Sequence, residues 1–150
     1  MFGKKLSEYI QFVNWILILV AVVFVIRLGL SLAGTSFTTT RWVSINVVLL
    51  LGLIYCSVAV HTSGFGSYKQ LFGLLLVQNV FAHSLIALGI IIGIVMGREN
   101  AFTGPEVSGG GNGATWFHAV IHPIAGFLVA GFAWLVGSVI LFVTKRLKPA

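Results

Sequence analysis

Long apolar stretches, separated by short polar segments, set the pattern of hydrophobic and polar positions along this chain. They cover about residues 10–34, 42–61, 72–97 and 116–144. An α-helix needs about 20 predominantly apolar residues to cross the hydrocarbon core of a bilayer. Because each of the four stretches is that long, the pattern predicts an all-α integral membrane protein, an antiparallel bundle of four transmembrane helices.

The composition favours the same class of protein. Hydrophobic residues make up 58% of the 150-residue chain and charged residues 8%, with a mean hydropathy of +1.06, which is typical of a protein surrounded mainly by lipid. Four spanning helices and their connections use nearly all of residues 1–150, so we expect a single transmembrane domain. Any activity then belongs to the helices or their loops rather than to a water-soluble catalytic domain.

The charged residues indicate how the bundle is oriented. The net charge is +6, and with four crossings most basic residues fall on the side that carries both termini: Lys4, Lys5, Lys69, Lys145, Arg146 and Lys148. The opposite side has only Arg41 and Arg98. Because positive charge concentrates on cytoplasmic segments, we expect both termini in the cytoplasm and the helices in the cell (inner) membrane. Basic residues at helix ends, without a basic stripe, favour anionic lipid headgroups over nucleic acid as a partner.

The segment 98–115 is the only sizeable connection between two apolar stretches. It contains Glu99 and Glu106, two of the three acidic residues of the chain. Its glycines predict mobility unless a partner fixes it. The loop fits equally a docking segment or lid over the non-cytoplasmic face and a plain tether between two helices.

Glycines repeat every four residues in the third apolar stretch, at Gly89, Gly93 and Gly97. Such a glycine zipper lets a neighbouring helix approach closely, because no side chain intervenes. The fourth stretch offers a matching surface of small residues, among them Gly126 and Gly137. We therefore expect the glycines of the third helix to pack against the fourth helix within the bundle, with contact to another subunit as the alternative.

Polar side chains inside the apolar stretches are the candidates for function, because an imidazole or amide in hydrocarbon needs a hydrogen-bond partner or a metal. At about 3.6 residues per turn, Asn79 and His83 share one face of the third helix. His118 and His122 are one turn apart on one face of the fourth helix. A rise of about 1.5 Å per residue places His83 near the middle of the bilayer and His122 inside its non-cytoplasmic boundary.

Two imidazoles from facing helices are a natural pair of axial ligands for haem iron. We therefore predict that His83, with His122 or His118, ligates the metal of a tetrapyrrole, haem b or a chlorophyll-type pigment, beside Asn79. Arg27 would pair with a propionate or another anionic group. The plainer interpretation makes the histidines interfacial residues or partners of backbone carbonyls, and Arg27 a side chain that reaches the surface along its apolar stem.

Missing residue types narrow the choice of function. No Asp or Glu lies inside an apolar stretch, which argues against a carrier coupled through carboxylate protonation. No acidic or sulfur ligand lies at the depth of the histidines, which disfavours a zinc or copper site. The chain also has no recognisable catalytic motif, so an enzyme is not favoured.

Three hypotheses for function follow. The first is a small non-catalytic subunit of a larger, energy-transducing membrane complex, respiratory or photosynthetic, that packs against other membrane subunits and helps to hold a tetrapyrrole, quinone or lipid. The second is a b-type cytochrome or quinone-reactive membrane anchor that uses His83 with His118 or His122. The third is a homo-oligomeric small channel or carrier with Asn46, Asn79 and His83 along its path.

Overall fold

The computed structural model describes residues 1–148. Over these residues the chain is all-helical, with the element order α1 (Leu6–Leu32), α2 (Phe37–Thr40), α3 (Ile45–Thr62), α4 (Tyr68–Met96) and α5 (Trp116–Leu147). Four helical stretches are long and apolar enough to cross a membrane: α1, α2 with α3, α4, and α5. The prediction of an all-helical protein with four such helices is confirmed.

Helix boundaries differ from the apolar pattern by a few residues, because polar residues begin and end the helices. At the start of α1 the backbone N–H of Lys5 donates to the Glu8 carboxylate over 2.7 Å. At the start of α4 the N–H of Ser67 donates to the Gln70 side chain over 3.0 Å. Such caps extend both helices about four residues before the apolar stretch, since they satisfy amides that lack a partner in the first turn.

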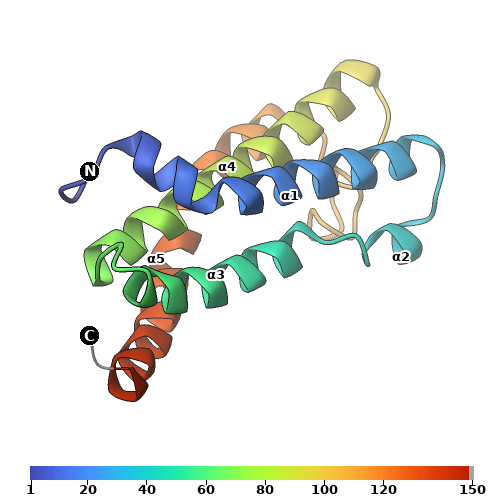
Figure 1. The fold of residues 1–150 in the computed structure, drawn as a ribbon. Helices are drawn as coiled ribbons and strands as arrows, with labels where there is room; N and C mark the ends of the chain where they lie inside the picture. Colours follow the sequence, from blue (N-terminus) through green and yellow to red (C-terminus); the bar gives the residue numbers. More distant parts are fainter. Residues whose placement is uncertain (149–150) are drawn as a thin grey trace.

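The four long helices form an antiparallel bundle with both termini at one end (Figure 1). We call this the terminal end, and the opposite end, where α2 and residues 98–115 lie, the loop end. Helix α4 packs against α1, α3 and α5, and its contact with α5 is the most extensive in the protein. Short connections return α3 beside α1 and α4 beside α3, while the longer segment 98–115 leads from α4 to α5.

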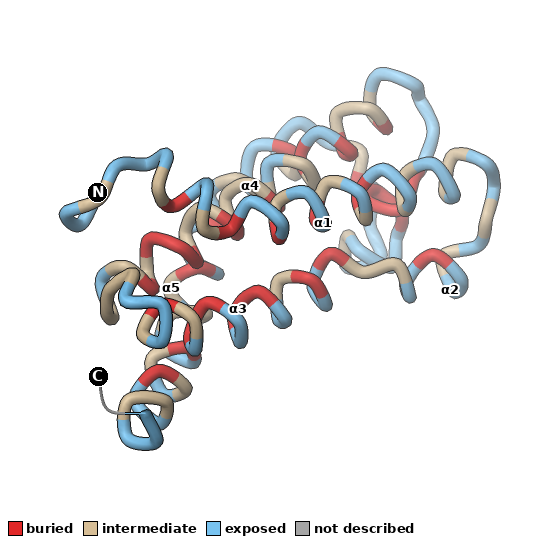
Figure 2. Tube along the Cα trace, viewed as in Figure 1, coloured by how far each residue is buried: buried red, intermediate tan, exposed pale blue. Residues whose placement is uncertain are grey.

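The buried residues of α1 recur every three or four positions: Tyr9, Val13, Ile16, Val20 and Phe24. This spacing places them on one side of the helix. In Figure 2 the buried segments of α1 and α3 lie on the sides that face the rest of the bundle, and exposed segments lie on the opposite sides. The exposed sides are also apolar, so each helix is hydrophobic around its whole circumference, as expected for a helix in lipid.

Helix α5 approaches its neighbours closely at two of its glycines, α4 at Gly126 and α3 at Gly137. A Cβ atom at Gly126 would lie 3.2 Å from the backbone oxygen of Asn79 and 3.3 Å from the Cα atom of Val80. A Cβ atom at Gly137 would lie 2.6 Å from Oγ of Ser57 on α3. The small residues of α5 therefore set the distance between α5 and its neighbours.

The glycines of α4 have a different partner from the one that the sequence predicted. A Cβ atom at Gly89 would lie 2.5 Å from Cδ2 of Phe102, and one at Gly93 would lie 2.9 Å from Cγ2 of Thr103. Gly97 ends the helix in a left-handed conformation with φ of 61°. The expected glycine zipper between the third and fourth helices is therefore wrong, because the 98–115 loop occupies this glycine face instead.

Residues 100–103 fold back into the loop end of the bundle and are at most 5% exposed. The Asn100 side chain holds them there. Its Nδ2 donates to the Gly89 carbonyl over 2.8 Å, and its Oδ1 accepts from the Phe102 N–H over 2.9 Å. The N–H of Asn100 donates to the Thr103 hydroxyl. This part of the loop is thus a fixed plug over the loop end.

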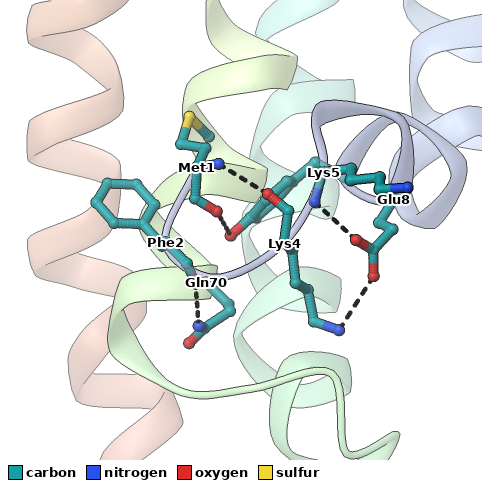
Figure 3. A network of polar contacts seen from close by, with 7 residues as sticks. Met1, Phe2, Lys4, Lys5, Glu8 and Gln70 are labelled. Carbon is teal, nitrogen blue, oxygen red and sulfur yellow. Dashed lines mark hydrogen bonds and ion pairs between the residues drawn. The ribbon is translucent and has the colours of Figure 1, made fainter.

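At the terminal end, polar contacts tie the first residues to the bundle (Figure 3). The Gln70 amide donates to the Phe2 carbonyl over 2.8 Å, and the amino terminus of Met1 donates to the Lys4 carbonyl over 2.7 Å. On the other side of α4, Nζ of Lys145 donates to Oγ of Ser67 over 2.7 Å. Polar side chains therefore gather at the helix ends, where the sequence placed them.

Candidate functional site

A pocket of about 320 Å³ lies at the loop end, enclosed by all four long helices and the loop. Its polar wall consists of Arg27, Asn46, His83, His118 and His122. Its apolar wall consists mainly of Ile45, Ile86, Phe102 and Val107. The bundle thus brings together four of the five residues that the sequence singled out, and it adds Asn46 and the loop.

The three histidines form a continuous hydrogen-bonded chain across α4 and α5. Nδ1 of His83 and Nδ1 of His122 are 3.2 Å apart, and Nε2 of His122 and Nε2 of His118 are 3.1 Å apart. Nδ1 of His118 lies 2.7 Å from the carbonyl oxygen of Gly113. The one-turn spacing of His118 and His122 aligns their rings, and the close approach at Gly126 brings His83 to them.

The Gly113 carbonyl determines the direction of this chain, because a carbonyl only accepts hydrogen bonds. Nδ1 of His118 therefore carries a proton, and in a neutral ring its Nε2 is then an acceptor. His122 must donate from Nε2, which makes its Nδ1 an acceptor for the Nδ1–H of His83. Nε2 of His83 is left with a free lone pair, and it has no hydrogen-bond partner within residues 1–148.

Arg27 supplies the positive charge of the pocket. Its guanidinium carbon lies 5.4 Å from the ring centre of Phe102 and 5.9 Å from that of Phe37, so the group sits against two aromatic rings. One Nη donates to the Ala101 carbonyl over a long 3.5 Å, and the buried Nε has no partner. In the described part of the chain the only ion pair joins Lys4 and Glu8, so no carboxylate neutralises Arg27.

The spacing of the imidazoles bears on metal ligation. Metal–nitrogen bonds of about 2.0–2.1 Å would hold two ligating nitrogens on opposite sides of one ion about 4 Å apart. The facing nitrogens of His83 and His122 are 3.2 Å apart and bond each other directly. Among the described residues, no group of three or more His, Cys, Asp or Glu side chains is arranged to hold a metal ion. The arrangement suits transfer of a proton better than ligation between the two rings.

No family model, curated protein or solved structure matches this chain. Function is therefore inferred from the pocket and its residues.

Asn79 and His61 lie apart from this pocket. Asn79 is buried and donates to the Leu75 carbonyl of its own helix over 2.8 Å, so it does not reach His83. Its backbone is instead part of the close contact with Gly126. His61 lies at the terminal end, where its Nε2 is 2.8 Å from the Lys148 carbonyl. The predicted sharing of a face by Asn79 and His83 did not bring their side chains together.

Two loop residues of the site were not anticipated from the sequence. Phe102 closes the apolar wall of the pocket and stacks on Phe24 with ring centres 5.3 Å apart. Gly113 orients the histidine chain through its carbonyl. The signal that could have found Phe102 is the pairing of small residues at Gly89 and Gly93 with a bulky residue in the only long loop.

Proposed function

We propose that the bundle spans the cell membrane with both termini in the cytoplasm, and that its pocket binds the anionic head group of a membrane amphiphile. The observation that carries the proposal is Arg27. Arg27 is half-buried, and its buried Nε has no hydrogen-bond partner. A guanidinium held against apolar surroundings without a carboxylate partner is costly, and residues of this kind mark binding sites or ion paths.

Membrane insertion is supported by the apolar outer surface of the bundle. Large hydrophobic side chains are exposed along every long helix: Val25 is 64% exposed, Phe132 is 73% exposed and Phe117 is 78% exposed. A soluble monomer rarely exposes apolar surface on this scale. The excess of basic residues at the terminal end supports cytoplasmic termini.

An anionic head group complements the pocket in charge and in hydrogen-bond geometry. The planar guanidinium presents parallel N–H groups that match the two oxygens of a carboxylate or phosphate, and Nε of Arg27 has its N–H still to offer. The apolar wall, with Ile45 and Ile86, suits the first part of an acyl chain. Asn46 lines the pocket and is exposed, so the pocket opens to the surface of the bundle there.

Among the ligands that the sequence suggested, a lipid fits these features best. A quinone is neutral and would leave the charge of Arg27 without a counterion. Ligation of haem b or a chlorophyll by His83 and His122 together would require their direct hydrogen bond to open. One free imidazole nitrogen, Nε2 of His83, remains for a single axial ligand, so the tetrapyrrole is the second candidate.

For the whole protein, we propose the role of a small non-catalytic subunit of a larger, energy-transducing membrane complex. Its support is the sequence, in which nearly all residues belong to the helices and no catalytic motif is recognisable. Isolation in mild detergent should then recover stoichiometric partner subunits. A stable, isolated monomer without partners would count against a subunit role and leave the lipid site untouched.

Arg27→Gln should weaken binding of oleate and of phosphatidylglycerol to the protein in nanodiscs by about 10- to 100-fold, because hydrogen bonds to charged groups contribute about 1.5–3 kcal/mol. Binding is measured by displacement of a fluorescent fatty acid. Methyl oleate, which lacks the charge, should compete poorly with the wild type.

Arg41→Gln is the matched control for this experiment. Arg41 is an exposed arginine at the same end of the bundle that packs on Trp42 and does not line the pocket. Its loss should leave the affinity within about twofold, as usual for a surface charge. Equal losses in the two variants, or affinity for methyl oleate equal to that for oleate, would rule out a specific anion site at Arg27.

A further inference from the structure

The histidine chain joins the pocket to a second depression at the surface of the loop end. His83 and His122 line the pocket, and His118 lines both the pocket and this depression of about 240 Å³. The depression also contains Ser108 and Asn112, which are polar loop residues. The chain therefore begins at a free lone pair on His83 and ends at a ring that borders two separate spaces.

We propose that the pocket takes a carboxylic acid amphiphile, such as a fatty acid, binds it as the carboxylate, and passes its proton along His83, His122 and His118 to the loop-end surface. This inference rests on the proposed anion site at Arg27 and names the class of ligand for it. It also gives a role to three polar residues that ligand binding alone does not need.

The proton balance is simple. The carboxylic acid O–H breaks, and its proton bonds to Nε2 of His83. His83 then gives its Nδ1 proton to Nδ1 of His122, and His122 gives its Nε2 proton to Nε2 of His118, along bonds of 3.2 and 3.1 Å. His118 now holds protons on both Nδ1 and Nε2, and it releases the Nδ1 proton to water at the depression when its bond to the Gly113 carbonyl opens. The carboxylate remains in the pocket, paired with Arg27.

The direction of transfer follows from the Gly113 carbonyl. It holds a proton on Nδ1 of His118, so the chain at rest has its only free lone pair at His83 and its N–H groups directed toward the loop end. A proton from the pocket finds an acceptor at once. A proton from the loop-end surface finds none until the Gly113 bond opens.

A carboxylic acid suits this arrangement better than a phospholipid. In an apolar medium the neutral acid is strongly favoured over its anion, so a fatty acid arrives with its proton and must lose it to pair with Arg27. A phosphodiester is already ionised and has no proton to give. Within residues 1–148, Arg27 on α1 and the histidines of α4 and α5 are the only charged or titratable side chains lining the pocket, and α3 and the loop contribute none.

The test is stopped-flow mixing of the protein in nanodiscs with lipid vesicles loaded with oleic acid in its protonated form, while a fluorescent fatty acid reports binding and a soluble pH dye reports proton release. The wild type should release about one proton for each oleic acid bound. In His122→Phe, which keeps a ring but interrupts the chain, proton release for each bound oleate should be on the order of 100-fold slower, the size expected of a lost proton-transfer group. Its affinity should fall less than that of Arg27→Gln.

His118→Phe interrupts the chain at its other end and serves as the second variant if His122→Phe does not fold. ¹⁵N NMR of histidine-labelled protein checks the resting chain directly: His83 and His118 should carry the proton on Nδ1, and His122 on Nε2. The opposite tautomers, or proton release at the wild-type rate in a folded variant, would overturn the proton path.

Different results would overturn the fatty acid inference and the proposed anion site. Binding of phosphatidylglycerol that depends on Arg27 and exceeds that of oleate would overturn the fatty acid inference and leave the proposed anion site standing. Binding of neither lipid would overturn both.

Discussion

Asn100→Ala is expected to release the plug from the loop end and to destabilise the loop by about 2–4 kcal/mol. The substitution removes the bond to the Gly89 carbonyl and the bond from the Phe102 N–H. The buried Phe102 N–H is then left without a partner, at a cost of about 1–3 kcal/mol, and the Gly89 carbonyl keeps its helical hydrogen bond but loses its second one, which is worth about 0.5–1.5 kcal/mol. Amide hydrogen exchange at residues 100–103 should rise by at least about tenfold, and limited proteolysis should reach the loop sooner.

Asn112→Ala is a closely matched control. Asn112 is in the same loop and its Oδ1 also accepts from the N–H two residues ahead, at Ala114, over 2.8 Å. It is exposed, however, so water can replace the lost bond. We expect an effect within about 0.5 kcal/mol. Similar exchange rates in the two variants would show that residues 100–103 are not held as described.

Gly126→Leu should separate α4 from α5 and destabilise the protein by about 3 kcal/mol, the upper part of the usual range for overpacking. Even a Cβ atom would lie 3.2 Å from the Asn79 backbone oxygen, and backbone cannot move aside as a flexible side chain can. The same shift would break the bond between His83 and His122. Unfolding in mild detergent with added denaturing detergent measures the loss of stability.

Gly131→Leu tests whether this effect is specific to the helix contact. Gly131 is on the same helix, and a Cβ atom there would have nothing within 4 Å. The larger side chain would enter the apolar groove beside Phe127 and Trp134, so stability should be unchanged or slightly higher. If Gly131→Leu destabilised the protein as much as Gly126→Leu, loss of glycine rather than loss of close packing would be the cause.

The helices could be predicted from the sequence because apolar stretches of this length have few other stable forms. The polar caps moved the boundaries by a few residues, as at Glu8 and Gln70. The position of the loop could not be predicted, because it depends on contacts that Phe102 and Asn100 make with Gly89 of α4. Spacing alone showed that α4 had room for a neighbour and did not say which segment would fill it.

The site shows the same division between local and long-range information. Helical periodicity correctly placed His118 and His122 on one face, since that is a property of one helix. The bond from His122 to His83 depends on how α4 and α5 cross, which the sequence does not specify. Asn79 shares the periodicity of His83, yet its side chain bonds its own helix. Amides in helices often bond a carbonyl one turn away when no other partner is in reach.

Arg27 connects these observations to function. Arg27 lies on α1, which packs against α4, and its guanidinium contacts the rings of Phe37 on α2 and Phe102 in the loop. The plug, the histidine chain and the arginine therefore form one site made from separate parts of the chain. In the proposed role, the few polar side chains of the pocket bind one acidic ligand and take up its proton.

Native mass spectrometry of the protein, released from its own membranes in mild detergent, tests the anion site most directly. The wild type should retain one acidic amphiphile per chain, and Arg27→Gln should lose it while Arg41→Gln keeps it. Retention of no acidic amphiphile by the wild type, or equal retention by Arg27→Gln, would contradict the account.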